Sequence, residues 1–318
     1  MLYFSRPCVS PALAQPKGDG GADCEIPPAG ADTGTSEQRR TSVAAFTCLI
    51  QKVIDSGKCR VAPDYHGPGA EFYDLVQTWQ DDLPYYLTWA ERQGSPILEL
   101  GAGTGRVLLP LARAGYRVTG LEASPDMLSI LERKLSGEPA DVRSRVTLLR
   151  GDMRDLCLNS RFCLILLPLH TLSHLLGYQD RLRVFRAAAR HLVPGGVLVA
   201  DVELGRPEET RTAPPAPVLS GVHYDAQRDS LLLILTHERP VQAPRPARHL
   251  ELLYLTVDAE GKASLTTTVC TEELTPVEEL RRLMEEAGLK PVGLYRNYAE
   301  EDLREEDPTA VAVARKPR

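Results

Sequence analysis

The sequence contains no long apolar run. Its 318 residues are 43% hydrophobic, enough to build a core. However, no stretch approaches the roughly 18 consecutive apolar residues that a membrane-spanning helix requires. Segment 11–15, PALAQ, faintly resembles a signal-peptide cleavage site, but neither a basic start nor a sustained apolar run precedes it. We therefore expect a globular, cytoplasmic protein with no membrane partner.

Closely spaced cysteines are also absent. The seven cysteines lie at positions 8, 24, 48, 59, 157, 163 and 270, and no two of them form a C-x-x-C pair. A disulfide framework or a zinc site made of cysteines needs closer clustering than this. The sequence therefore predicts reduced thiols in a reducing compartment and no bound metal.

An excess of positive charge is missing as well. Lysine and arginine total 37 against 43 aspartates and glutamates, so the formal net charge is −6. Proteins that bind nucleic acids usually present a basic face to the phosphates. The charge balance therefore disfavours nucleic acid as a partner.

Three glycines at alternate positions are the first positive signal. The segment 97–107, ILELGAGTGRV, reads as the end of a buried strand, a tight turn at Gly101, Gly103 and Gly105, and the start of a helix. Glycine accepts positive φ angles and has no Cβ to hold a ligand away from the backbone. The segment therefore predicts the first unit of a nucleotide-binding α/β fold.

Strands alternating with helices follow this turn. Segment 116–123 predicts a second strand ending at Glu122, and a helix follows because Ser124 can cap free N–H groups while Pro125 suits the first turn. Three more strands are predicted at 145–152, 161–169 and 197–203, with a helix over 178–191 before the last. This alternation indicates a parallel sheet with helical crossovers.

The pattern changes after residue 204. Runs at 217–225, 230–238, 249–258 and 262–270 read as strands joined by turns, which predicts an antiparallel insert. A helix capped by Thr275 follows, and two closely linked strands at 291–298 and 309–317 favour antiparallel pairing. The prediction is an α/β fold: a Rossmann-like, mostly parallel seven-stranded sheet with an antiparallel last strand, plus a small inserted antiparallel β-sheet.

This pattern divides the chain into four parts. Residues 1–40, rich in Gly, Pro, Ala, Ser and Asp, predict a disordered tail. Residues 41–204 hold N-terminal helices, one of them over 43–54, and the ligand-binding α/β core. Residues 205–273 form the antiparallel insert, and residues 274–318 complete the core.

The glycine spacing disfavours a dinucleotide ligand. Dinucleotide-binding turns follow G-x-G-x-x-G, with the pyrophosphate at the helix N-terminus. Here the spacing is G-x-G-x-G, and the carboxylate of Glu99 just before the turn would repel pyrophosphate but attract an amino group. A ligand with a cationic portion therefore fits better than an anionic one, and a nicotinamide-dependent oxidoreductase is only a lesser alternative.

Five segments in a fixed order carry a resemblance to one family. They are ELGAGTG (99–105), GLEASPDML (120–128), RGDMRDL (150–156), HLVPGG (191–196) and AVAVARKP (310–317). With this order and spacing, roughly residues 60–318 resemble a class I S-adenosylmethionine-dependent methyltransferase. The resemblance implies S-adenosyl-L-methionine as cofactor and a methyl acceptor as substrate.

The resemblance also implies the cofactor contacts. Glu99 would lie near the amino group of the ligand through water, Glu122 would accept hydrogen bonds from the ribose hydroxyls, and Asp152 would accept one from the adenine amino group. Each acid could instead be a solvated strand end, a helix cap or a partner of loop amides. The full predicted set is Tyr73, Glu99, Gly101, Gly103, Gly105, Glu122, Ala123, Asp152, Met153 and Leu167.

Two histidines are the candidate catalytic residues. His170 and His174 follow the fourth predicted strand, where acceptor chemistry is expected in this fold, and an imidazole can take a proton at neutral pH. We favour His170 slightly because it is nearer the strand end. A capping or packing role is the alternative for each, and metal binding by the pair lacks an apparent third ligand.

The resemblance leaves the acceptor open. The Asn/Asp-Pro-Pro-Tyr/Phe motif for methylation of nucleic-acid amino groups is missing, because the chain reads LPLH over 167–170. We therefore expect transfer to an N or O atom of a small molecule, with the insert as a roof over the acceptor and, if a homodimer forms, as its contact surface. The alternative is a non-catalytic S-adenosylmethionine-binding module that acts through a protein partner.

Overall fold

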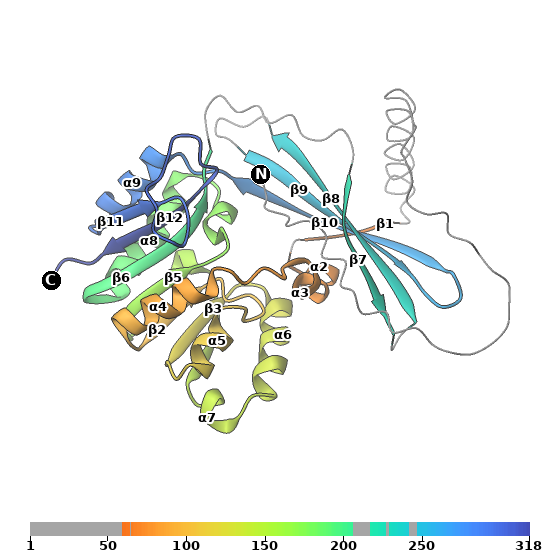
Figure 1. Cartoon of the computed structure of the whole chain (residues 1–318), viewed down its shortest axis with the longest axis horizontal. Helices are drawn as coiled ribbons and strands as arrows, with labels where there is room; N and C mark the ends of the chain where they lie inside the picture. Colours follow the sequence, from red (N-terminus) through yellow and green to blue (C-terminus); the bar gives the residue numbers. More distant parts are fainter. Residues whose placement is uncertain (1–58, 64, 206–216, 227–228, 242–246) are drawn as a thin grey trace.

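A seven-stranded sheet forms the centre of the molecule (Figure 1). The computed structural model describes residues 59–63, 65–205, 217–226, 229–241 and 247–318. The tail predicted over 1–40 and the helix predicted over 43–54 lie outside these residues. The strands follow the order β11 (Lys290–Tyr295), β12 (Thr309–Arg315), β6 (Leu192–Glu203), β5 (Phe162–Leu167), β2 (Ile97–Leu100), β3 (Val118–Glu122) and β4 (Val146–Arg150).

The strand directions confirm the predicted fold class. Strands β6, β5, β2, β3 and β4 pair in parallel. The last strand, β12, is antiparallel to both of its neighbours, β6 and β11. The sheet order runs outward from β2 in both directions, so the carboxyl ends of β2, β3 and β5 lie side by side at one edge. Ligands of such sheets bind at that edge.

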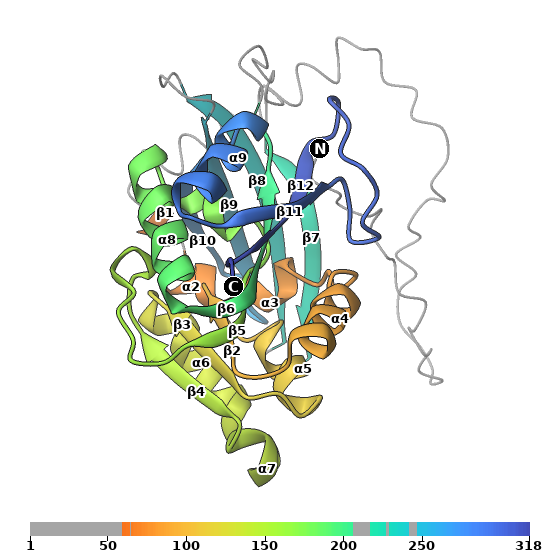
Figure 2. The same cartoon turned by 90° about the vertical axis from the view of Figure 1, so that its left-hand side faces the viewer.

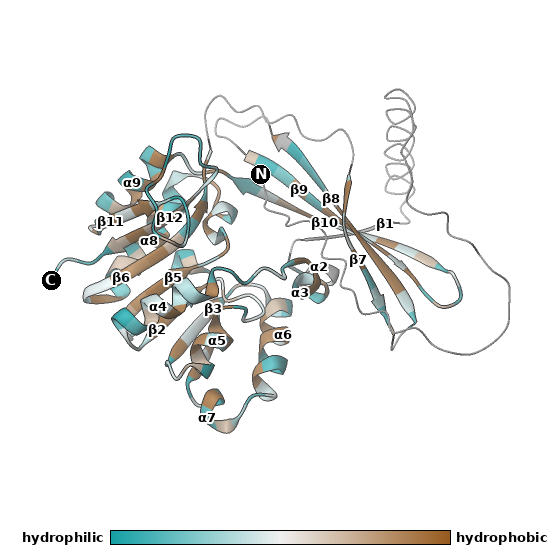
Figure 3. Ribbon diagram, viewed as in Figure 1, coloured by the Kyte–Doolittle hydropathy of each residue, from teal (hydrophilic) through white to brown (hydrophobic). Residues whose placement is uncertain are grey.

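Helices cover both faces of this sheet. One face packs against α8 (Tyr178–His191) and α9 (Val277–Glu286), and the other packs against α4 (Leu83–Gln93), α5 (Leu108–Arg113) and α6 (Pro125–Ser136). Hydrophobic residues are concentrated on the central strands (Figure 3), because a strand buried on both faces needs apolar side chains at every position. Shorter helices are α2 (Pro68–Glu71), α3 (Tyr73–Val76), α7 (Ala140–Arg143) and the 3₁₀ turns η1 (Met153–Asp155) and η2 (Thr171–His174). In the described part of the chain, every helix is too short or too polar to cross a membrane.

One of the two predicted helix caps is confirmed, and the other is wrong. At α6 the Ser124 hydroxyl accepts a hydrogen bond from the Met127 N–H (3.3 Å), and Pro125 occupies the first turn, as predicted. At α9 the predicted cap is wrong. The N-cap position belongs to Pro276, and the buried Thr275 hydroxyl makes no hydrogen bond to any described residue. Because Pro276 is extended, the helix begins only at Val277.

The inserted strands form a second sheet beside the core. Strands β7 (Val218–Asp225), β8 (Ser230–Val241), β9 (Ala247–Val257) and β10 (Ala263–Glu273) pair antiparallel in sequence order, which confirms the predicted insert. A fifth strand, β1 (Cys59–Pro63), joins parallel to β10 and was not predicted. Figure 1 shows α2 and α3 between this sheet and the core, and Figure 2 shows the same elements from the side of the core.

A buried arginine joins the insert to the core. The Arg248 guanidinium on β9 donates to both carboxylate oxygens of Glu203 at the end of β6 (2.7 and 2.6 Å) and to Glu272 Oε2 on β10 (2.8 and 2.6 Å). Glu238 lies 3.6 Å away on β8. We call these four side chains the Arg248 cluster. Since charges buried this deeply need partners, the cluster fixes the insert to one strand end.

A second buried arginine also links the insert to the core. Arg181 on α8 is fully buried and donates to the carbonyl oxygens of Leu175 (3.0 Å) and Glu273 (2.5 Å). Its guanidinium also pairs with the Glu279 carboxylate on α9 (3.2 Å). One side chain therefore holds together the end of β10, the segment after β5 and two helices of the core.

Removal of Arg248 should strongly destabilise the protein. In Arg248→Ala, the buried carboxylates of Glu203 and Glu272 lose a cationic partner, so we expect the free energy of unfolding to fall by about 3–5 kcal/mol. Urea denaturation measures this change. The control is Arg239→Ala, which breaks an exposed pair with Glu251 and should cost at most about 1 kcal/mol. Equal, small losses in both variants would contradict the anchoring role of Arg248.

Candidate active site

A cavity lies at the carboxyl ends of β2, β3 and β5. Its volume is about 180 Å³, well above the ~10–15 Å³ that one water needs, so it can hold part of a ligand. The loops after these strands and the segment before α4 supply its walls. The lining residues are Tyr65, Tyr73, Glu99, Gly101, Ala102, Gly103, Thr104, Arg106, Val107, Glu122, Ala123, Met127, Met153, Pro168, Leu169, Thr171, His174 and Leu175.

The three glycines of the turn have different roles. All have positive φ angles, +75° at Gly101, +55° at Gly103 and +89° at Gly105. A Cβ at Gly101 would lie 2.7 Å from the Thr171 methyl group, so this glycine lets the segment after β5 approach the turn. A Cβ at Gly105 would overlap Leu131 of α6. Gly101 and Gly103 line the cavity, whereas Gly105 serves the packing of the turn against a helix.

Glu122 ties the turn to the neighbouring strand. Its Oε2 accepts a hydrogen bond from the Gly103 N–H and its Oε1 one from the Ser124 N–H, both at 2.8 Å. A carboxylate has about four acceptor sites, so these bonds leave capacity for two ligand hydroxyls. The carboxylate therefore binds loop amides, which is the structural role considered for this residue, and it also borders the cavity, as a ligand-binding residue would.

Glu99 is a buried carboxyl group with an unsatisfied oxygen. It is 2% exposed, and its Oε2 makes no hydrogen bond to any described residue. Burial raises the pKa of the Glu99 carboxyl to about 8, and the nearby Arg106 guanidinium opposes this only in part. A buried acceptor without a partner, at the wall of a cavity, fits a ligand that supplies an ammonium group.

A buried ion pair that the sequence did not indicate closes one side of the cavity. Arg106 lines the cavity and forms a two-pronged salt bridge with Asp82 (2.5 and 2.7 Å), whose side chain is fully buried. The same guanidinium donates to the Trp79 carbonyl (3.2 Å). This geometry fixes the segment before α4 against the glycine turn.

Aromatic rings from the N-terminal segment cover the other side. The Tyr65 hydroxyl lies 2.8 Å from Nε2 of His174, and the Tyr65 ring packs edge-on against the rings of both His174 and Tyr73. Asp74 holds this cover in place, because its carboxylate accepts from the Thr104 hydroxyl (2.6 Å) and pairs with Lys134 (2.6 Å). Tyr73 was predicted here, whereas Tyr65 was not.

The two candidate histidines are separated by the structure. His174 lines the cavity, whereas His170 does not. Leu169 and His170 both adopt left-handed backbone conformations with φ of 53°, and the His170 N–H donates to Asp201 Oδ1 (2.9 Å). The other Asp201 oxygen accepts from the Tyr298 hydroxyl (2.6 Å). Of the two histidines, His174 is therefore the better candidate for the catalytic residue, contrary to our slight preference for His170 from the sequence.

Two other predicted contacts do not line the cavity. Leu167 is fully buried in the core beneath α8. Asp152 begins η1, where its carboxylate accepts from the Arg154 backbone N–H (2.8 Å) and pairs with the Arg154 guanidinium (2.6 Å). These hydrogen bonds lower the pKa of the Asp152 carboxyl. The neighbouring Met153 is the η1 residue that borders the cavity.

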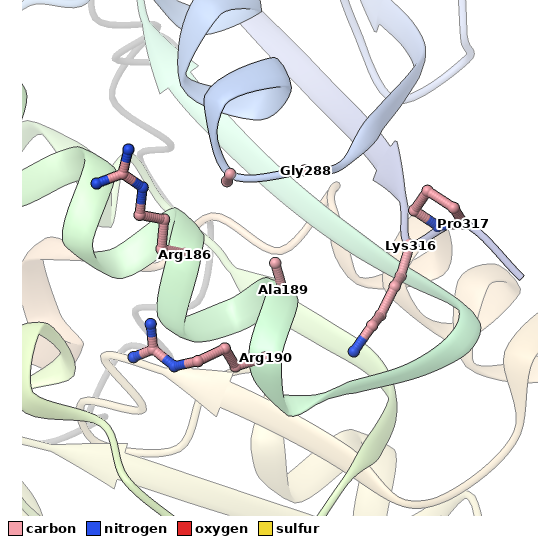
Figure 4. A pocket seen from close by; sticks show the side chains of 7 residues that line it. Arg186, Ala189, Arg190, Gly288, Lys316 and Pro317 are labelled. Carbon is pink, nitrogen blue, oxygen red and sulfur yellow. The ribbon is translucent and has the colours of Figure 1, made fainter.

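A second hollow lies at the opposite edge of the sheet. Arg186 and Arg190 of α8, Gly288 after α9, and Lys316 surround about 440 Å³ (Figure 4). The Lys316 ammonium donates to the Leu192 carbonyl (2.8 Å), at the start of β6. This hollow is therefore at the amino ends of the parallel strands, away from the edge where this fold binds ligands.

The fold and the first cavity define an α/β core with a ligand cavity at the carboxyl ends of its parallel strands. The methyltransferase domain family matches residues 97–196, which run from the strand before the glycine turn into β6. The cypemycin N-terminal methyltransferase of Streptomyces sp. is 27% identical over 241 residues, which cover 74% of this chain and 91% of that protein.

Further relatives agree with this match. The dTDP-3-amino-3,6-dideoxy-alpha-D-glucopyranose N,N-dimethyltransferase of Streptomyces fradiae is 32% identical over 146 residues, and the match spans 43% of this chain and 54% of that protein. The sugar N-methyltransferase KedS8 from Streptoalloteichus sp. has the same fold. Its TM-score is 0.65 at 21% identity, over 81% of this chain and 96% of that one.

The domain match and these relatives support an enzyme of the class I S-adenosylmethionine-dependent methyltransferases, whose cofactor is S-adenosylmethionine. The cavity fits that cofactor. The Glu99 oxygen without a partner suits the ammonium group, and Gly101 and Gly103 keep the cavity free of Cβ atoms beside it. Glu122 offers acceptor sites for a diol.

Cofactor binding should release a proton from Glu99. The carboxyl group is protonated below about pH 8 in the free protein, whereas an ammonium ligand favours the carboxylate. Calorimetry with S-adenosylhomocysteine near pH 6.5, in buffers of different ionisation enthalpy, measures this release. The affinity should rise between about pH 6 and 7, by at most about tenfold. Glu99→Gln should abolish both the release and the slope, and an unchanged proton release in this variant would exclude the assignment.

Proposed function

We propose that this enzyme transfers the methyl group to an amine nitrogen of a small molecule. The supporting observation is the Tyr65–His174 pair at the wall of the cavity. An amine acceptor that arrives as a cation must lose a proton before its lone pair can attack, and an imidazole is suited to take it. Two of the relatives named above carry N-methyltransferase names, and a third is named an N-terminal methyltransferase, which supports nitrogen over oxygen as the acceptor atom.

In this mechanism the protein mainly aligns the reactants. The bound cofactor supplies a methyl group already activated by its sulfonium sulfur. Gly101, Gly103 and Glu122 shape the floor that holds the donor, while Tyr65 and Tyr73 exclude water above it. The acceptor nitrogen would take this methyl group from the sulfur. The acceptor proton goes to the Nε2 side of His174, either directly or through the Tyr65 hydroxyl, which passes on its own proton.

The cofactor contacts belong to this proposal. Glu99 would face the amino group and Glu122 the ribose hydroxyls, and Met153 would serve the adenine ring from η1. Asp152 directly precedes Met153 at the start of η1. The adenine ring would extend past Met153 out of the cavity, and its amino group would then reach the Asp152 carboxylate. The antiparallel insert, fixed by the Arg248 cluster, would roof the acceptor.

Substitution of His174 should slow methyl transfer. A panel of aminosugars and peptide amines first identifies an acceptor. With that acceptor, His174→Asn should lower the single-turnover rate by roughly 100-fold or more, because no imidazole then takes the proton from the amine. The affinity for S-adenosylhomocysteine should change little.

The matched control is His170→Asn. Since His170 does not line the cavity, this variant should keep nearly the full rate. Equal rates for wild type and His174→Asn would show that alignment alone drives the reaction. Methylation confined to hydroxyl groups across the panel would exclude an amine acceptor.

We further propose that two copies associate through β7. This strand pairs only with β8 among the described strands, so its outer edge is open. It also exposes four large apolar side chains, which are 53–64% accessible: Val218, Leu219, Val222 and Tyr224. An open edge with apolar side chains can pair with the same edge of a second copy, as in closed two-fold dimers.

Charges on this edge should prevent the association. The double variant Leu219→Glu, Val222→Glu places like charges opposite each other in the paired edges, and sedimentation should show a monomer where the wild type is a dimer. Val292→Glu is the control, because Val292 is similarly exposed (44%) on β11 of the core sheet. A wild-type protein that sediments as a monomer would disprove this dimer.

A further inference from the structure

Three side chains from distant parts of the chain meet beside the cavity. His174 in η2 lies next to Cys270 and Glu272 of β10, and one ligand atom from each falls within 4.8 Å of the others. Cys270 makes no disulfide. The three are not fully exposed, and Glu272 is buried. We propose that this trio is a site for a soft divalent cation such as zinc, which would inhibit the enzyme.

The donor set is typical of zinc. Thiolate, imidazole and carboxylate are the protein groups that bind this ion, and imidazole together with thiolate selects it over magnesium or calcium. Tetrahedral bonds of ~2.0–2.3 Å hold the ligand atoms roughly 3.3–3.8 Å apart. Since the three ligand atoms lie within 4.8 Å of one another, the side chains need to close by at most about 1–1.5 Å around an ion. Three protein ligands leave the fourth position for water.

The hydrogen bonds already present leave room for an ion. Both hydrogen bonds from Arg248 to Glu272 end on Oε2, so Oε1 is a separate acceptor. On His174, a hydrogen bond joins Nε2 to the Tyr65 hydroxyl, and an imidazole has a second nitrogen. A hydrogen bond to one nitrogen commonly orients the ring for metal binding at the other.

The charge of the surroundings favours a cation. The Arg248 cluster contains one guanidinium and the three carboxylates of Glu203, Glu238 and Glu272. The cluster therefore carries two more negative charges than positive ones. This excess compensates for the guanidinium that would otherwise repel a divalent ion at Glu272.

Zinc at this site would stop the reaction through His174. The ion would occupy an imidazole lone pair of the same ring that, in our proposed function, receives the acceptor proton. No electron transfer is involved: Cys270 loses a proton to solvent as the thiolate binds the ion. The inhibition rests on the proposed function, whereas the zinc site itself does not.

The binding test compares two cysteine variants of the full chain. Zinc binding is measured by competition with a chromophoric chelator, after melting curves have confirmed that each variant folds. Cys270→Ser should weaken the tightest zinc site by about 100-fold, because a thiolate ligand is lost, and His174→Asn should do the same. Cys157→Ser, which removes an exposed thiol elsewhere, should leave it unchanged. Equal zinc affinity in wild type and Cys270→Ser would overturn the site.

Cobalt identifies the ligand directly. Cobalt(II) bound by wild type and Cys157→Ser should show a near-ultraviolet thiolate charge-transfer band that Cys270→Ser lacks. For the inhibition, zinc should abolish turnover of wild type and Cys157→Ser reversibly with chelator, while Cys270→Ser stays active. Tight zinc binding that leaves wild-type turnover intact would refute the role of His174 as the proton acceptor but not the site.

Discussion

The position of the insert depends on the buried charge of Arg248. A guanidinium inside the protein is tolerable only when carboxylates surround it, and here those carboxylates come from β6, β8 and β10. Arg181 adds a second constraint, because its donors reach α9 and the end of β10. Together the two arginines hold β10 against η2, which carries His174.

The electrostatics of the cavity also depend on which buried charged groups have partners. Glu99 and Glu122 end neighbouring strands, but their surroundings differ. Loop amides satisfy both oxygens of Glu122, whereas one oxygen of Glu99 lacks a partner and its pKa is raised to about 8. A cationic ligand group therefore gains most beside Glu99. The polarity of the site follows from which carboxyl group the backbone leaves unsatisfied.

The local sequence predicted most elements of the core, but it missed several residues of the site. The glycine turn, the Ser124 cap and the alternation of strands and helices were predictable because each depends on neighbouring residues or on a short period. Strand β1 was missed because its partner β10 is distant in sequence. Gly105 was predicted as a ligand contact, but the need to pack Leu131 explains it. Tyr65 and Arg106 carried no motif, since their roles arise from contacts across the chain.

The sequence alone determined the parallel sheet, its antiparallel last strand, the antiparallel insert and the family resemblance, since these follow from periodicity, turn chemistry and motif order. Only the tertiary structure decided between the two histidines. Asp201 and Tyr298 fix the left-handed turn at His170, and the cavity closes around His174 instead. The meeting of His174 with Cys270 and Glu272 was likewise beyond the sequence. Such contacts depend on how one sheet is held against another, which no local pattern encodes.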